Sequence, residues 1–264
     1  REYIVPSRLH PGKFYVLPQS PQQLKQLSMV AGLDRYFQIA RCFRDEDQRG
    51  DRQPEFTQLD LEMSFVEEED VLQVNEALML ALCDSLAPKK KILQRPFPRM
   101  SWEEAMSNYG SDKPDMRFGM VLTDVTDFVM HSKFNVFTDA VKKKGVVKAL
   151  KAPGGVKFSR KDIENFTEVA KVYGDKGLAY ITLENGELKS PIAKYFTKEE
   201  LEKIKLRTEM QEGDLVFFAA DEFRVACVSL GAVRLALAER ANLRDPNVFA
   251  FCWIIDFPMF EWSD

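Results

Sequence analysis

The sequence predicts an α+β fold, in which an antiparallel hairpin with one polar face is followed by a second region of mixed helices and strands. Three observations carry this prediction. Residues 55–65 alternate strictly between apolar and polar side chains, which is the period of a half-buried strand. Several Ser or Thr residues stand three positions before Glu or Gln, as in a helix capping box. Asn185 and Gly186 give a strong hairpin-turn signal.

Composition bounds the class of protein. The chain has 264 residues, of which 45% are hydrophobic and 30% charged, enough for one large or two modest globular domains. A net charge of -4 provides no global attraction for nucleic acid, so such contacts would rest on local patches. The sequence has no run of 18 apolar residues, so we expect no membrane partner. Scattered cysteines favour reduced thiols in a cytoplasmic protein and argue against a zinc site.

The first clear element is a helix over residues 20–32. Ser20 and Gln23 complete a capping box, Pro21 suits the first helical position, and Gly32 can end the helix. The helix has two different faces: one is apolar, and the other carries Gln22, Lys25 and Met29.

A hairpin follows, formed by residues 36–44 and 55–65 and joined by a polar loop of about ten residues. Gln58, Asp60 and Glu62 share one face of the second strand, about 7 Å apart. The loop brings several arginines, whose planar guanidinium groups suit phosphate, and Phe56 can stack on a base. These residues alone leave two interpretations open: a nucleotide site, or a solvated hairpin with a charged tip.

The later elements are less regular. Predicted helices cover residues 68–86, 101–110, 159–173, 197–211 and 230–241. Predicted strands cover residues 134–137, 146–150, 180–183, 188, 215–219, 224–229 and 249–255. The pattern of predicted helices and strands changes near residues 110–119 and 241–246. We therefore predict that the segments before and after these boundaries belong to one domain, and that the segment between them is an insertion.

The exact amino-acid sequence of the hairpin is more informative than its pattern of apolar and polar residues. Arg44–Glu46 together with Arg52–Glu62 resembles motif 2 of class II aminoacyl-tRNA synthetases, and more narrowly the aspartyl type. Further segments resemble other parts of the bacterial-type aspartyl enzyme in the same order: Pro6–Arg8, Leu17–Gln22, Lys25–Leu27, Ser111–Arg117, Ala152–Gly155, Tyr173–Tyr180 and Ile255–Phe260.

The resemblance implies a fold and an activity. It implies a class II antiparallel-sheet catalytic domain interrupted by an α+β insertion of the GAD type: residues 1–115 and 244–264 would be catalytic, and 116–243 the insertion. The family joins aspartate to ATP with Mg2+, forming aspartyl-adenylate, and transfers the aspartyl group to the acceptor end of tRNA(Asp). Its full-length members are homodimers. The implied metal-binding acids lie outside this sequence.

The resemblance also assigns roles residue by residue. Arg44 and Glu46 would be catalytic. The implied ATP-binding residues are Arg44, Glu46, Arg52, Gln53 and Phe56. The implied aspartate-binding residues are Ser20, Gln22, Lys25, Arg44, Gln58 and Asp60. Lys25 would pair with the side-chain carboxylate of aspartate and Asp60 with its ammonium group. Glu62 would belong to the site or support one of its arginines.

Several alternatives stay open. The chain could belong to a class II ligase for asparagine or lysine, or to a non-catalytic tRNA-binding module that shares the insertion. It begins at Arg1 without Met, so we expect an internal fragment that lacks motifs 1 and 3 and has no ligase activity alone. Lysines 142–144, 148 and 151 form either an RNA contact or a solvated hairpin tip.

Overall fold

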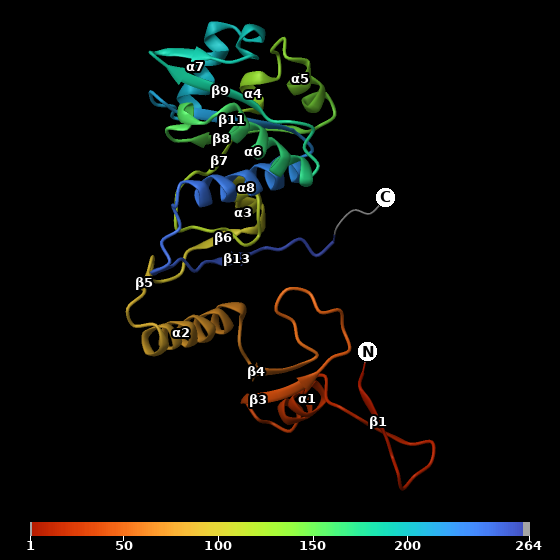
Figure 1. The fold of residues 1–264 in the computed structure, drawn as a ribbon. Helices are drawn as coiled ribbons and strands as arrows, with labels where there is room; N and C mark the ends of the chain where they lie inside the picture. The colour runs from red at the N-terminus through yellow and green to blue at the C-terminus, as the bar shows by residue number, and fades with distance from the viewer. Residues whose placement is uncertain (1, 261–264) are drawn as a thin grey trace. The chain divides into compact units, whose positions relative to one another are not determined.

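The computed structural model describes residues 2–260. The chain divides into two compact units, Arg1–Ser85 and Leu86–Asp264, which are considered separately below (Figure 1). Within the described residues no helix is both long and apolar enough to cross a membrane. Cys42, Cys83, Cys227 and Cys252 are all free thiols, as expected from the sequence.

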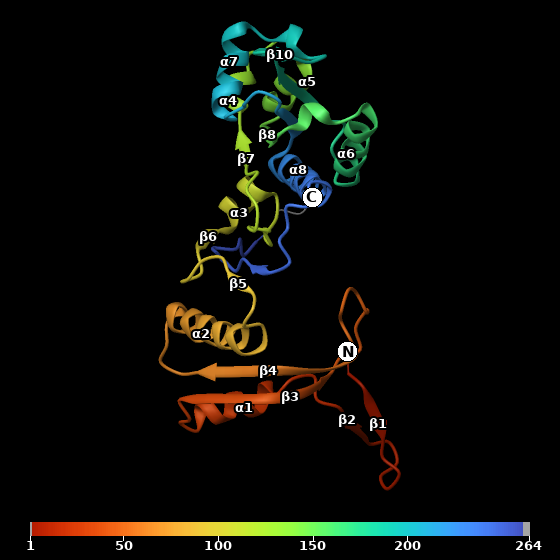
Figure 2. The ribbon, with the colours of Figure 1, turned by 60° about the vertical axis from the view of Figure 1, so that its left-hand side comes forward.

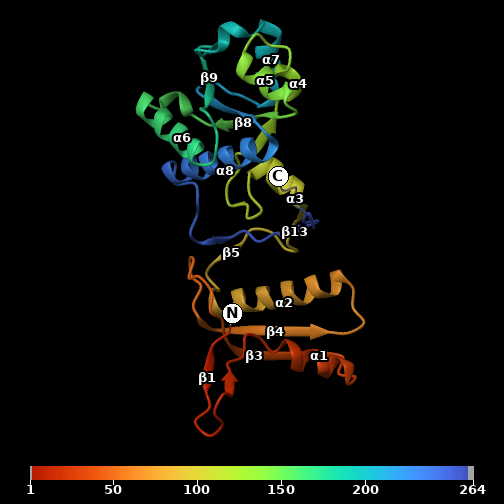
Figure 3. The ribbon, with the colours of Figure 1, turned by 90° about the vertical axis from the view of Figure 1, so that its right-hand side faces the viewer.

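The first unit is built on two hairpins and two helices. Strands β1 (Ile4–Pro6) and β2 (Phe14–Val16) form a short antiparallel pair. Strands β3 (Arg35–Phe43) and β4 (Glu55–Met63) form the long hairpin that the sequence predicts. Helix α1 (Gln22–Val30) lies along this hairpin, and α2 (Glu68–Leu86) lies on its other side (Figures 2 and 3).

The register of the long hairpin confirms the predicted alternation. Gln38 lies opposite Asp60, and Ala40 lies opposite Gln58, so these side chains share one face. Ala40 and Cys42 on this face are buried. Helix α1 therefore covers the polar face of the hairpin, which is the reverse of the usual arrangement in which the polar face meets water.

The predicted start of α1 is wrong in detail. Pro21 is the N-cap, and neither Ser20 nor any other side chain caps the helix. Lys25 is the buried residue of α1, whereas Leu24 and Leu27 on its apolar face are exposed. The end of the helix agrees with expectation, because Gly32 takes a positive φ of 93°.

The second unit contains a five-stranded antiparallel sheet in the order β10-β9-β11-β8-β7. Its strands are β7 (Leu122–Asp124), β8 (Val146–Ala152), β9 (Ala179–Glu184), β10 (Glu187–Lys189) and β11 (Leu215–Asp221). Asn185 and Gly186 join β9 to β10 with positive φ values of 54° and 75°, as the two-residue hairpin signal predicts.

Helices cover both faces of this sheet (Figure 1). On one face α6 (Arg160–Val172) and α8 (Phe223–Arg240) enclose a core that includes Leu150, Phe217 and Leu230. On the other, α4 (Thr126–Val129), α5 (Asn135–Lys142) and α7 (Lys198–Arg207) enclose a core around Phe137 and Phe218. Two short 3-10 turns, Gly155–Lys157 and Ala193–Tyr195, complete the unit.

The predicted capping boxes mark real helix starts. Ser101 caps α3 (Trp102–Tyr109) and Thr197 caps α7, each with the Glu three residues later completing the box. Ser159 caps α6 with Asp162 in the same way. Gly110 ends α3 in the left-handed conformation.

Two predicted strands are helices in the structure. Residues 134–137 lead into α5, and residues 224–229 form the first turns of α8. The buried residues Ala226, Leu230, Val233 and Leu237 recur every three or four positions, so the helical period prevails over the strand preference of valine.

The predicted strand at 249–255 is also wrong as a single element. It forms two short strands, β12 (Val248–Phe249) and β13 (Trp253–Ile255), which pair in parallel with β5 (Lys91–Ile92) and β6 (Arg99–Ser101). The predicted return segment ends at residue 264, so its last four residues lie outside the described range. The domain boundaries near residues 116 and 243 stay predictions.

The predicted lysine cluster is not one surface. Lys142 and Lys143 lie at the end of α5, whereas Lys148 is buried on β8 and pairs with Asp124 at 3.2 Å. Lys151 donates a hydrogen bond to the carbonyl oxygen of Glu209. The interpretation as a hairpin tip is therefore wrong, and these lysines form no continuous basic patch.

Helix α8 is fastened to the segment that precedes β7 by Arg234. This side chain is fully buried, and its guanidinium group donates hydrogen bonds to four carbonyl oxygens, those of Asp115, Phe118, Gly119 and Met120. Its carbon Cζ also lies 4.1 Å from the centre of the Phe118 ring. Burial lowers the pKa of Arg234 to about 10, which leaves the group charged at neutral pH.

Replacing Arg234 with methionine is expected to destabilise the chain by about 3 kcal/mol, because four carbonyl groups lose a buried, charged donor. Urea denaturation followed by tryptophan fluorescence measures this loss. Arg240→Ala on the same helix is the control: Arg240 is half exposed, pairs with Asp162 and lies over the Phe158 ring, so a much smaller loss is expected. Equal losses in the two variants would contradict the fastening role.

Candidate functional site

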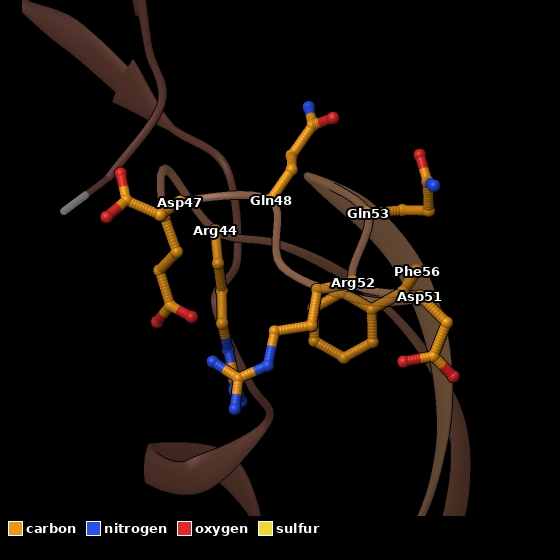
Figure 4. Close-up of a pocket in the computed structure, with 8 residues that line it drawn as sticks. Arg44, Asp47, Gln48, Asp51, Arg52, Gln53 and Phe56 are labelled. Atoms are coloured by element: carbon orange, nitrogen blue, oxygen red, sulfur yellow. The ribbon is translucent and has the colours of Figure 1, made fainter. Parts of the chain in front are cut away.

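A pocket of about 400 Å³ lies at the loop that joins β3 to β4 (Figure 4). Its volume is within the range of small-molecule sites. All five residues predicted to bind ATP line it. The complete lining is Arg44, Glu46, Asp47, Gln48, Asp51, Arg52, Gln53 and Phe56.

The two arginines of this pocket point toward the same region. Figure 4 shows the guanidinium groups of Arg44 and Arg52 converging beside the ring of Phe56. The Cζ atom of Arg44 lies 5.1 Å from the centre of that ring. Two guanidinium groups beside an aromatic face can bind a phosphate chain and stack a flat heterocycle.

The orientation of Arg44 depends on the segment that precedes α1. Its Nε atom donates a hydrogen bond to the carbonyl oxygen of Gln19 at 3.3 Å. The neighbouring backbone amide of Phe43 donates to the carbonyl oxygen of Pro18 at 2.8 Å. The loop pocket is thereby tied to the segment that carries Ser20 and Gln22.

A second pocket, of about 550 Å³, lies around that segment. Ser20 and Gln22 line it from the start of α1, and Gln38, Ala40 and Arg41 line it from β3. Gln58 lies opposite Ala40 in the hairpin register and is half-buried. Of the predicted aspartate-binding residues, Ser20 and Gln22 line this pocket and Arg44 lines the loop pocket, whereas Lys25, Gln58 and Asp60 line neither of the two.

Lys25 forms the charged centre of this face. Its Nζ atom lies 3.0 Å from Oδ1 of Asp60 and 3.0 Å from Oε2 of Glu62. The side chain of Lys25 is only 11% exposed, so its ammonium group needs these partners. The hydrogen bonds from Lys25 to Asp60 and Glu62 raise the pKa of the lysine, which keeps it charged well above neutral pH.

One carboxylate oxygen of Asp60 is available for a further hydrogen bond. Its Oδ2 atom is buried and has no hydrogen-bond partner among the described residues. A buried carboxylate oxygen without a donor is costly, and the structure can relieve that cost by accepting a hydrogen bond from a bound ligand. The chemistry that fits is an ammonium group.

Sequence reasoning missed some members of the site and left the role of Glu62 open. Asp47, Gln48 and Asp51 line the loop pocket without having been singled out. Glu62 was expected either in the site or beside an arginine, yet its partner is Lys25. The alternation that places Glu62 two residues after Asp60 was the signal that could have found this contact.

Arg49 shows that not every loop arginine belongs to the pocket. Its side chain is 81% exposed and lies 3.7 Å from Asp47 in a surface ion pair. It does not line the pocket that Arg44 and Arg52 share. The arrangement is therefore selective: two arginines of the loop converge, and the third faces solvent.

Comparisons with known proteins agree with this site. The family model of class II tRNA synthetases (D, K and N) matches residues 1–263. An aspartate–tRNA(Asp/Asn) ligase of Hydrogenobaculum sp. (strain Y04AAS1) is 52% identical over 264 residues, which cover all of this chain and 44% of that protein.

Two further relatives show the same relation. An aspartate–tRNA ligase of Geobacillus kaustophilus is 52% identical over 265 residues, covering all of this chain and 45% of the relative. An aspartate–tRNA(Asp/Asn) ligase of Bacillus subtilis is 52% identical over 262 residues, covering 99% of this chain and 44% of the relative. The chain thus spans less than half the length of these relatives. It belongs to the class II tRNA synthetases of the D, K and N family.

Proposed function

We propose that the full-length protein containing this chain is an aspartate–tRNA ligase. It would join aspartate to ATP, release pyrophosphate, and pass the aspartyl group from the adenylate to the acceptor end of tRNA(Asp). One observation carries the proposal: a pocket with paired arginines and a phenylalanine adjoins a face where a lysine and an aspartate are held side by side. The printed names of the relatives support it.

The loop pocket would hold ATP. Phe56 would stack on adenine, and Arg52 and Gln53 would contact the outer part of the nucleotide. Arg44 would grip the α-phosphate and the α-carboxylate of aspartate, where it neutralises the charge that builds at phosphorus during attack. Glu46, on the same lining, would face ATP or the end of the tRNA.

The covered face of the hairpin would hold aspartate. Asp60 offers its unpartnered Oδ2 to the ammonium group of the substrate, and Lys25 offers its charge to the side-chain carboxylate. Ser20, Gln22 and Gln58 would supply the remaining polar contacts. Such a site favours aspartate over asparagine, because only the carboxylate of aspartate gives the Lys25 ammonium group a charge-assisted hydrogen bond.

The described residues do not account for the Mg2+ ion that accompanies ATP in this family. Among residues 2–260 no group of three or more His, Cys, Asp or Glu side chains is placed to hold a metal ion.

The proposal extends to architecture and partners. The sheet of the second unit, with helices on both faces, would form the GAD-type insertion over residues 116–243, between catalytic segments 1–115 and 244–264. The full-length protein would act as a homodimer, with tRNA(Asp), aspartate and ATP as partners. Charging tRNA for translation would place it in the cytoplasm.

Amino-acid-dependent exchange between ATP and pyrophosphate tests the proposal. The full-length protein is expected to exchange with aspartate and not with asparagine or lysine, since only aspartate complements both Lys25 and Asp60. Exchange driven by lysine or asparagine would assign the protein to another member of the family. No exchange with any amino acid would favour a tRNA-binding module.

The 264-residue chain supplies the matching control. We expect it to show no exchange, because it spans less than half of the length of its relatives and lacks the remaining part of their catalytic machinery. Exchange by this chain alone would show that the residues described above suffice for activation.

A further inference from the structure

We propose that Glu62 is a positioning residue of the amino-acid site, which acts through Lys25 and keeps the second oxygen of Asp60 free for substrate. The inference rests on the proposed function and goes beyond it. Glu62 does not touch the substrate in this account. It determines where the Lys25 ammonium group lies and in which direction its remaining hydrogen points.

The geometry places Lys25 between two carboxylates on one strand. Asp60 and Glu62 are two residues apart on β4, so both side chains project from the face that α1 covers. Each lies 3.0 Å from Nζ of Lys25. The side chain of Asp60 is 15% exposed, whereas that of Glu62 is 37% exposed at the edge of the contact.

Two carboxylates fix the direction of an ammonium group. Lysine has three N–H donors on a flexible four-carbon stem, and here two of them are directed to Asp60 and Glu62. The tetrahedral geometry of nitrogen then leaves a single direction for the third. With only one carboxylate, the group could rotate about that contact, and the third donor would have no defined direction.

Glu62 also prevents Lys25 from binding both carboxylate oxygens of Asp60. Only Oδ1 of Asp60 contacts the lysine, and Oδ2 has no partner in the described part of the chain. Without Glu62, the ammonium group would have one anion left, and it could move to share both oxygens of Asp60. The acceptor for the substrate's ammonium group would then be occupied, and the lysine would be drawn away from the substrate's carboxylate.

Charge explains why this arrangement is not simply a stabilising ion pair. One carboxylate suffices to neutralise Lys25, and a second leaves the cluster with a net negative charge. Excess negative charge disfavours the carboxylates of the proposed ligand. A second acid in this place therefore has an electrostatic cost for binding, which a positioning role offsets.

The test is the kinetics of aspartate-dependent exchange in the full-length protein carrying Glu62→Ala or Glu62→Gln. Glu62→Ala is expected to raise the KM for aspartate roughly tenfold or more, the effect of removing a hydrogen bond to a charged group. The kcat and the KM for ATP should change less than about twofold. Glu62→Gln should restore part of the loss, because its amide oxygen still accepts from Lys25.

Ser64→Ala is the matched control. Ser64 lies just after the end of β4, two residues beyond Glu62, and its hydroxyl donates a hydrogen bond to the sulfur of Met29 on α1 at 3.2 Å. If Glu62 merely held α1 against the hairpin, both variants would raise the KM alike. The inference expects Ser64→Ala to leave the KM for aspartate unchanged.

The outcomes separate the inference from the proposed function. An unchanged KM in Glu62→Ala would overturn the positioning role, and a lowered KM would show instead that Glu62 competes with substrate for Lys25. If the unmodified protein shows no exchange with aspartate, the proposed function itself fails. Glu62→Gln keeps the side-chain volume, so it decides the matter should Glu62→Ala fail to fold.

Discussion

Replacing Arg44 with alanine in the full-length protein is expected to lower kcat/KM for aspartate-dependent exchange by about a hundredfold or more. A donor aimed at developing charge contributes an effect of this size in other enzymes. Arg44 is the one predicted site residue that connects the two pockets, since it lines the loop pocket and donates to the carbonyl oxygen of Gln19 beside Ser20. Its loss should therefore impair the use of both ATP and aspartate.

Arg49→Ala is the matched control for this variant. Arg49 belongs to the same loop, carries the same charge, and lies in an exposed pair with Asp47. Its removal should change kcat/KM by less than about twofold, because exposed ion pairs contribute little. A similar loss in both variants would mean that the charge of the loop matters, rather than the convergence of Arg44 and Arg52.

Replacing Gly110 with alanine is expected to destabilise the chain by at least about 4 kcal/mol. A Cβ atom at this position would lie 2.0 Å from the carbonyl oxygen of Cys227 and 2.8 Å from Cα of Gly231. Both are backbone atoms of α8, so α3 and α8 would have to separate. The residue also has a φ of 68°, which alanine adopts only with strain.

Gly154→Ala separates the two causes. Gly154 has a φ of 66°, and a Cβ atom there would have no neighbour within 4 Å. It should therefore report only the backbone cost, about 1 kcal/mol. Urea denaturation followed by tryptophan fluorescence measures both variants; Trp102, the first residue of α3, is one of the three reporters. Equal losses would show that the close contact between α3 and α8 is not what requires glycine at position 110.

The elements that could be predicted were those with a local signal. The alternation of residues 55–65 predicted β4, the capping boxes at Ser101 and Thr197 predicted two helix starts, and Asn185–Gly186 predicted a hairpin. In each case a short stretch determines the structure through its own hydrogen bonds or turn geometry.

The failures have a common physical cause. The start of α8 contains valines and alternates locally, so a short window favours a strand. Its helical character shows only over the whole of residues 223–240, where buried positions recur on one face against the sheet. Tertiary packing determines the structure of this segment, and a short window of sequence contains no information about that packing.

The sequence predicted which residues form the candidate site better than it predicted the contacts between them. Motif resemblance brought together Arg44, Arg52 and Phe56, which line one pocket. It did not reveal that α1 covers the polar face of the hairpin, or that Lys25 lies between two carboxylates. Those contacts depend on how a helix packs on a hairpin. The spacing of Asp60 and Glu62 places both acids on one face of β4, but it does not show which element covers that face.

The most direct test of the central claim is aminoacylation of purified tRNA by the full-length protein. The account predicts that tRNA(Asp) accepts labelled aspartate, and that neither labelled lysine nor labelled asparagine is transferred to any tRNA. Transfer of lysine or asparagine, or failure to charge tRNA(Asp) by a folded protein that binds ATP, would contradict it.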